Sequence, residues 1–310
     1  MVRIILTLLV LIWGVYSLHP TVSDGLLHII FCDVGQGDAT IIRLNSVQVL
    51  IDGGRDDSVL RCLQESLPPW DKHLEIVIAT HPDADHINGL VSVLENYTAG
   101  VLLHNGQVKE TADFNRFKSA VQNQVEQGAV QVTAKSGMTI HIEEYLDLSV
   151  IYPHSSSTPG GALSDQQAET ILSDVEASNA ADVLNYNDAS IVLKLRYGLL
   201  DVLLMGDLEE AGERALIDGG LIAEVEVLKV GHHGSKTSST SEFIGITRPE
   251  ISVISAGKNN AYGHPHPLVI ERLTQVGSQI LRTDQDSTIE LVSNGMIVLR
   301  RPRHVWFKKR

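Results

Sequence analysis

The sequence has few cysteines, few aromatic residues and few long apolar runs. Only two cysteines, Cys32 and Cys62, occur among its 310 residues. Export would permit a disulfide, but their spacing indicates no pairing, so we expect buried free thiols. Aromatic residues make up 5% of the chain, and beyond the N-terminal segment no apolar run is long enough to cross a bilayer. These absences exclude a disulfide-rich scaffold and a bundle of membrane-spanning helices for this chain.

Basic residues are also scarce: the chain has 24 of them and 38 acidic residues, which gives a formal net charge of −14. This deficit argues against non-specific binding of nucleic acid, which depends on basic surface. Six of the basic residues nevertheless lie between Arg300 and Arg310, together with Trp306 and Phe307. The resulting basic tail, residues 303–310, could contact a phosphate backbone or an anionic membrane surface, or it could be a solvated chain end.

The N-terminal segment, residues 1–24, has the character of a targeting sequence. One positive charge precedes an apolar stretch of about a dozen residues, which is typical of a secretory signal peptide. A full membrane span needs about 20 apolar residues, but an uncleaved N-terminal anchor is an alternative. Either interpretation predicts a protein that is secreted or anchored on the outer face of the cytoplasmic membrane.

The rest of the chain predicts one large α/β domain over residues 25–302. Strand-like and helix-like patterns alternate, 43% of the residues are hydrophobic, and we find no internal repeat. Residues 153–182 differ, because they are rich in Ser, Pro, Gly and Ala and contain no Lys or Arg. We expect this stretch to be a loop inserted in the domain, either mobile or covering a site.

The densest group of metal-ligand side chains follows the apolar run Leu74–Ala79, which predicts a buried strand. Apolar residues at helical spacing begin at Ile87, so we expect the group to lie in a loop between a strand and a helix. Imidazoles and carboxylates are ligands of borderline divalent metals, although two aspartates could instead solvate the turn and cap the helix. The group consists of His81, Asp83, Asp85 and His86.

This group resembles the metal-binding motif of the metallo-β-lactamase superfamily, in which His-x-His-x-Asp-His supplies ligands to two adjacent ions. Asp83 stands here in place of the second histidine. With that variant, the chain is similar to the hydrolase-like domain of ComEC competence proteins from about residue 28 to about residue 300, but without their membrane channel region. The other matching segments are Asp33–Asp38, Leu50–Gly54, Leu203–Leu208, Val227–Ser235 and Tyr262–Pro265.

The resemblance implies a four-layer αββα sandwich with metal ions at one edge, between its two sheets. It assigns His81 and Asp83 to one ion, Asp85 and His86 to the other, and Asp207 to both. Asp207 could alternatively cap the helix that follows it. The last histidine ligand is His232 or His233, and we expect only one of them to bind because neighbouring residues leaving a strand point to opposite faces.

The third ligand of the first ion is missing, because the corresponding region around Asn187 contains no histidine. Asn187 matches an asparagine of ComEC-like sequences, and Asp188 could reach a metal instead. Together with Asp83, this makes the first position rich in oxygen. We therefore expect two divalent ions, Zn²⁺ or Mn²⁺, with one of them bound weakly.

Further residues are expected around the metals. Asp52 could orient a histidine ligand or serve as a turn residue. Asp85 and His264 are the expected catalytic residues, with His264 protonating the leaving oxygen or holding a phosphate oxygen. The remaining candidates, which could support the ligands, contact substrate or simply belong to polar loops, are Asp33, Asp38, Ser235 and Lys236.

By this resemblance, the expected function is an exported, metal-dependent phosphodiesterase, most specifically a nuclease that degrades DNA during uptake. Phosphodiesters of cell-envelope polymers and small nucleotides are alternative substrates for the same site. Hydrolysis of β-lactams fits worse, because the site has fewer imidazoles than the zinc sites of those enzymes. A non-catalytic module that binds DNA or an envelope partner is the alternative outside enzymology.

Overall fold

The computed structural model describes residues 24–153 and 186–302. Three predicted segments therefore lie outside the described residues: the signal peptide or anchor up to residue 23, the inserted loop from residue 154, and the basic tail from residue 303. Within the two described ranges, no helix combines the length and the apolar character that a membrane span requires.

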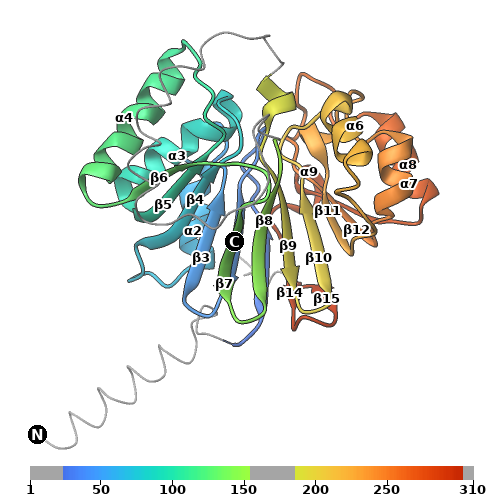
Figure 1. The fold of residues 1–310 in the computed structure, drawn as a ribbon, viewed down its shortest axis with the longest axis horizontal. Helices are drawn as coiled ribbons and strands as arrows, with labels where there is room; N and C mark the ends of the chain where they lie inside the picture. The colour runs from blue at the N-terminus through green and yellow to red at the C-terminus, as the bar shows by residue number, and fades with distance from the viewer. Residues whose placement is uncertain (1–23, 154–185, 303–310) are drawn as a thin grey trace, which may run out of the picture.

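Two β-sheets pack face to face in the middle of the molecule (Figure 1). The first sheet has the order β15-β14-β1-β2-β3-β4-β5-β6 and the second has the order β13-β12-β11-β10-β9-β8-β7. The first contains β1 (Leu27–Phe31), β2 (Thr40–Leu44), β3 (Val47–Ile51), β4 (His73–Ala79), β5 (Thr98–His104), β6 (Val130–Thr133), β14 (Ile289–Ser293) and β15 (Val298–Arg300). The second contains β7 (Thr139–Glu143), β8 (Leu146–Tyr152), β9 (Val192–Tyr197), β10 (Leu200–Leu204), β11 (Val227–Lys229), β12 (Ile251–Ile254) and β13 (Gln279–Arg282).

Helices cover the outer face of each sheet, which confirms the predicted four-layer αββα sandwich (Figure 1). The first sheet carries α2 (Ser58–Ser66), α3 (Ala84–Asn96) and α4 (Ala112–Glu126). The second carries α6 (Glu210–Asp218), α7 (Ser241–Thr247) and α8 (Pro267–Gln275). The short elements are η1 (Tyr186–Ala189), η2 (Gly231–Gly234) and α9 (Thr283–Asp286).

Alternation along the strands fills the spaces between the layers. In β1, Ile29 faces the second sheet and Ile30 faces the helices, because successive side chains of a strand point to opposite sides. Leu193 and Val202 meet Ile29 from the second sheet in the same apolar core. Strands buried on both faces need nearly continuous apolar sequence, which explains the runs seen in the sequence.

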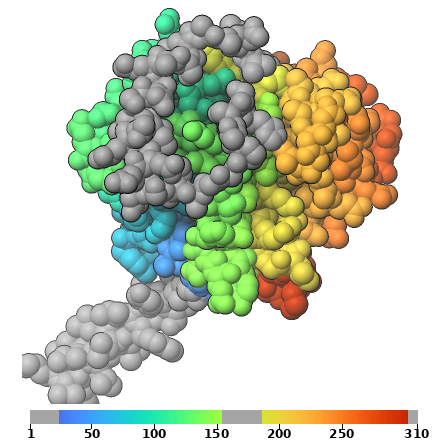
Figure 2. All heavy atoms as spheres, viewed as in Figure 1, coloured from blue at the N-terminus to red at the C-terminus, as the bar shows by residue number. Residues whose placement is uncertain are grey.

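The direction of the strands places the functional edge. In each sheet an antiparallel hairpin, β2–β3 or β9–β10, is followed by parallel strands. Parallel strands end at the same edge of a sheet, so the loops after β3, β4, β10 and β11 gather there. The tips of the hairpins β7–β8, β9–β10 and β14–β15 touch at the opposite end, where Leu199 N donates to Gly295 O (2.6 Å) and Gly198 N to Tyr145 O (3.3 Å) (Figure 2).

Cys32 and Cys62 form a disulfide, so the expectation of free thiols was wrong. Cys32 follows β1, and Cys62 lies in α2, which packs on the outer face of the same sheet. The two residues are 30 positions apart in sequence, but their Cα atoms are 5.9 Å apart. Sequence spacing alone could not reveal this proximity, because it depends on where α2 crosses the sheet.

Candidate metal centre

Imidazole and carboxylate groups from several loops converge at the edge where the parallel strands end. His86 Nε2 lies 3.3 Å from Asp207 Oδ1, and His233 Nε2 lies 3.5 Å from Asp207 Oδ2. His233 Nε2 is also 3.5 Å from Asp85 Oδ2, and His81 Nε2 is 3.9 Å from Asp207 Oδ2. Asp207 thus lies at the centre of three histidines that come from both halves of the sandwich.

The start of α3 presents two of these groups. The helix begins at Ala84, not near Ile87 as expected, so Asp85 and His86 lie in its first turn. The unpaired N–H groups and the dipole of a helix N-terminus favour a carboxylate such as Asp85. The helical geometry, which the sequence pattern did not reveal, therefore fixes where both side chains project.

Glycines allow this helix to sit directly on neighbouring loops. Gly53 N donates to His86 O (2.7 Å), and Gly89 N donates to Gly54 O (3.0 Å). A Cβ atom on Gly89 would overlap the carbonyl oxygen of Gly53. Asp38 N donates to Asp85 O (3.2 Å) on the other side of the helix start. The backbone around α3 is therefore packed too closely for side chains at these glycines.

Asp52 binds the Nδ1 side of the His86 ring. Its Oδ2 atom accepts from His86 Nδ1 (2.8 Å) and from the Thr80 hydroxyl (2.7 Å), and its Oδ1 atom accepts from Thr80 N (2.8 Å). The carboxylate is buried, and burial raises its pKa. Because His86 uses Nδ1 for Asp52, its Nε2 atom is directed toward Asp207.

His233 is held by a second buried acid. His233 Nδ1 lies 3.1 Å from Ser255 O and 3.5 Å from Asp38 Oδ1, and Lys229 Nζ donates to Asp38 Oδ2. Burial alone would raise the pKa of Asp38, but the ammonium of Lys229 holds it well below its usual value. Lys229 was not among the predicted residues, although a lysine inside an apolar strand is a recognisable signal for a buried ion pair.

The two adjacent histidines occupy different places. His233 is buried in the cluster, whereas the His232 side chain is 22% exposed at its rim, with Nε2 3.8 Å from Asp207 Oδ2. His232 Nδ1 lies 2.8 Å from Glu209 Oε1, which also accepts from the Thr237 hydroxyl (2.8 Å). Glu209 was not predicted, because nothing in the sequence shows that its side chain contacts the ring of His232.

His264 completes the rim. Its ring centroid lies 5.5 Å from that of His232 and 6.3 Å from that of His233. Burial and the neighbouring imidazoles lower its pKa to about 4. His264 is therefore a neutral imidazole beside the cluster.

Other predicted residues lie outside the cluster. Asp83 Oδ1 accepts from Lys109 Nζ (2.7 Å), and none of the metal-ligand groups among the described residues includes Asp83. Asp188 accepts from Glu209 N (3.3 Å), and it lies with Asn187 in η1. These positions differ from the direct metal contacts that the sequence suggested for Asp83 and Asp188.

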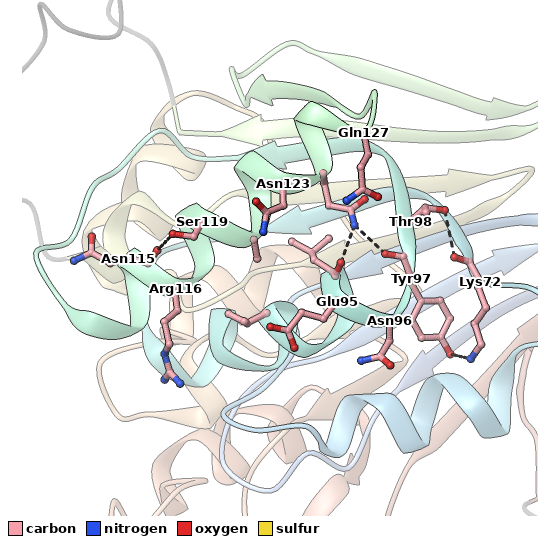
Figure 3. Close-up of a pocket in the computed structure, with 14 residues that line it drawn as sticks. Lys72, Glu95, Asn96, Tyr97, Thr98, Asn115, Arg116, Ser119, Asn123 and Gln127 are labelled. Atoms are coloured by element: carbon pink, nitrogen blue, oxygen red, sulfur yellow. Dashed lines mark hydrogen bonds between the residues drawn. The ribbon is translucent and has the colours of Figure 1, made fainter.

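The last three candidates belong to polar turns. Asp33 is exposed and accepts from Gly35 N (3.3 Å), so it stabilises its own loop and does not reach the cluster. Ser235 Oγ lies 2.8 Å from Thr237 Oγ1, and Lys236 is exposed. A pocket of about 680 Å³ between α3 and α4 lies apart from all these residues (Figure 3).

The charges of the cluster favour a cation. Burial would raise the pKa of Asp207, but the imidazoles of His233 and His86 hold it well below its usual value. Burial and the charge of His86 lower the pKa of His81 to about 3, which leaves a neutral imidazole. Burial opposes protonation of His233, but Asp207 and Asp38 raise its pKa to about 10. The same carboxylates would attract a metal ion.

Buried ligand atoms that lack a hydrogen-bond partner provide a test of whether a metal fits. Buried polar atoms normally have hydrogen-bond partners. Four atoms that face one another here have no hydrogen-bond partner among the described residues. Imidazole nitrogens and carboxylate oxygens are suitable ligands for Zn²⁺ and related divalent ions, so the residues fit a metal centre. The four atoms are His81 Nε2, His86 Nε2, His233 Nε2 and Asp207 Oδ1.

Comparisons with known proteins agree with this geometry. Residues 32–258 match the family model described as the metallo-beta-lactamase superfamily. ComE operon protein 3 of Bacillus subtilis is 30% identical over 283 residues, which are 83% of this chain and 32% of that protein. Competence protein ComA of Neisseria gonorrhoeae is 38% identical over 130 residues, which are 40% of this chain and 18% of that protein. The chain thus spans at most about a third of these relatives.

A solved structure shows the same fold at low sequence identity. Zn²⁺-bound PqqB from Methylobacterium extorquens superposes with a TM-score of 0.53 and 11% identity, and the match covers 85% of this chain and 99% of that one. The family model covers most of the described domain, and the sandwich and the histidine-aspartate cluster agree with it. The chain therefore belongs to the metallo-β-lactamase superfamily.

Proposed function

We propose that this protein is an exported, metal-dependent phosphodiesterase that cleaves DNA. The observation that carries the proposal is the convergence of buried imidazoles on Asp207, with their Nε2 atoms facing its carboxylate. Asp85, His86, His233 and Asp207 would hold one divalent ion, and His81 would share Asp207 with a second. When bound, such ions polarise a phosphoryl oxygen and lower the pKa of a water molecule.

The chain's own residues would bind and orient the phosphodiester at the rim. Glu209 fixes the ring of His232 through Nδ1, so Nε2 remains directed toward the cluster. His264, whose ring is in edge contact with His232, would hold a phosphate oxygen or transfer a proton to the leaving oxygen. Asp85 Oδ2 lies 3.5 Å from His233 Nε2, and Asp85 would orient the attacking water.

DNA is the proposed substrate because relatives of this chain include a protein named for competence. The net charge of −14 opposes approach of a polyanion, and bound dications together with the basic tail would offset it locally. Zn²⁺ and Mn²⁺ are the expected ions, since the ligands combine imidazoles with carboxylates. Phosphodiesters of envelope polymers or small nucleotides are the alternative substrates for the same site.

The disulfide supports location outside the cytoplasm. The bond between Cys32 and Cys62 requires oxidising conditions, which are typical of secreted and periplasmic proteins and rare in the cytosol. We therefore propose that the domain acts after export, either released or attached to the outer face of the cytoplasmic membrane through residues 1–24. The basic tail could add contact with anionic lipid.

Degradation of end-labelled linear DNA by the purified full chain tests the proposal. With Mn²⁺ or Zn²⁺ we expect cleavage of single-stranded or double-stranded DNA, which chelation abolishes and Asp207→Ala reduces below detection. Asp33→Ala is the matched control, because Asp33 is an exposed aspartate outside the cluster, and it should cleave like the parent protein. Intact DNA with both metals would contradict the proposal, and hydrolysis of bis-p-nitrophenyl phosphate by the same sample would then favour another phosphodiester.

A further inference from the structure

Lys109 pairs with Asp83, the aspartate that the resemblance of the metal loop assigns to an ion together with His81. Its Nζ atom donates to Asp83 Oδ1 at 2.7 Å and lies 4.7 Å from the centroid of the Tyr186 ring. Both charged side chains are partly buried, with 28% exposure for Lys109 and 30% for Asp83. The ammonium therefore neutralises the one aspartate of the metal loop that does not join the cluster.

We propose that Lys109 competes with the second metal ion for Asp83, so that the protein binds one divalent ion tightly and a second only after Asp83 leaves Lys109. This inference rests on the metal centre of the proposed function and deepens it by making the occupancy of the second position depend on one residue of this chain. It does not depend on which phosphodiester is cleaved.

The two metal positions have unequal ligand sets. Asp85, His86 and His233 form one group whose ligand atoms lie within 4.8 Å of one another, and Asp207 adjoins it. The other position has His81 together with Asp207 and His86, both of which also adjoin the first position. With Asp83 bound to Lys109, His81 is the one ligand in this group, among the described residues, that the first position does not share, whereas protein sites usually supply three or four ligands.

The position of Lys109 is fixed by its surroundings. The loop that carries it is tied to η1, where Asn105 Nδ2 donates to Ala189 O (3.0 Å) and the Tyr186 hydroxyl donates to Val108 O (3.4 Å). The backbone of Asp83 is constrained as well, because this residue immediately precedes α3 and its carbonyl oxygen accepts from His86 N (2.9 Å) and Ile87 N (3.1 Å). The contact between them therefore belongs to the packing of two anchored segments and is not a chance meeting of two surface charges.

Calorimetric titration of the metal-free full chain with Mn²⁺ tests this inference. The parent protein should show one tight event and one weaker event. Lys109→Met should tighten the weaker event about five- to tenfold, because a partly buried ion pair no longer competes and a nearby positive charge is lost. Asp83→Asn should remove the weaker event and leave the tight one unchanged.

Lys72→Met is the matched control. Lys72 also contacts a tyrosine, with Nζ 3.1 Å from the Tyr97 hydroxyl and 4.4 Å from its ring centroid, but at the far end of α3 (Figure 3). This variant should bind both ions like the parent protein. The inference is overturned if Lys109→Met leaves the weaker event unchanged or weakens it, or if the parent protein binds two ions equally tightly.

The result also separates this inference from the proposed function. Two unequal binding events that respond to Lys109→Met, in a protein that leaves DNA intact, would support the inference and reject the nuclease. DNA cleavage by a parent protein that binds two ions equally tightly would support the nuclease and reject the inference about Lys109.

Discussion

A single carboxylate, that of Asp52, determines how His86 presents its Nε2 atom. Three donors share this carboxylate: the ring of His86 and the backbone and hydroxyl of Thr80. Asparagine offers one acceptor oxygen, so Asp52→Asn must leave at least one buried donor facing an NH₂ group. Loss of such an outer partner typically costs about 10- to 100-fold in metal affinity.

We therefore predict that Asp52→Asn weakens Zn²⁺ binding by about 10- to 100-fold, measured by competition with a chromophoric chelator. Asp33→Asn is the matched control, since both aspartates were candidates from the sequence and, of the two, Asp52 contacts a histidine of the cluster. Equal affinities for the two variants would contradict the role of Asp52.

At this scale, the sequence predicted residue types better than positions. The histidines of the metal loop and Asp207 do lie together, because loops after parallel strands must meet at one edge. The contact between Asp83 and Lys109 could not be read from the sequence, since it depends on a loop 26 residues further along the chain. Glu209 was missed for the same reason.

At the scale of elements, the close backbone contact between α3 and the loop after β3 fixes where α3 presents Asp85 and His86. Gly53 and Gly89 meet backbone to backbone, and the same contact positions His86 O on Gly53 N. The apolar pattern predicted the existence of this helix but not its start at Ala84, because the first turn carries the polar residues Asp85 and His86, which belong to the cluster. The disulfide was equally invisible, since it depends on how α2 lies on the sheet.

We predict that Gly89→Ala lowers the free energy of unfolding by about 2–3 kcal/mol, because the added methyl group overlaps Gly53 O and the backbone must shift. Urea unfolding under non-reducing conditions measures this. Gly245→Ala in α7 is the control, because its added Cβ meets no atom within 4 Å and should stabilise the helix by about 0.5–1 kcal/mol. A neutral effect of Gly89→Ala would show that α3 is not seated as described.

At the scale of the whole molecule, two halves of similar construction contribute to one centre. Each half supplies a hairpin followed by parallel strands, and the two sets of loops meet only because the sheets pack face to face. The αββα class was predictable, since strand and helix patterns alternate and the motifs occur in the order of the family. The contacts of Glu209 with His232 and of Lys229 with Asp38 were not, because they depend on side chains that cross between loops.

The most direct test of the central claim is an anomalous difference map from crystals of the full chain grown with Zn²⁺. We predict the strongest peak in contact with Asp85, His86, Asp207 and His233, and a weaker peak or none beside His81. A map without a peak among these residues, or with its only peak elsewhere on the molecule, would contradict the assignment of this cluster as the metal centre.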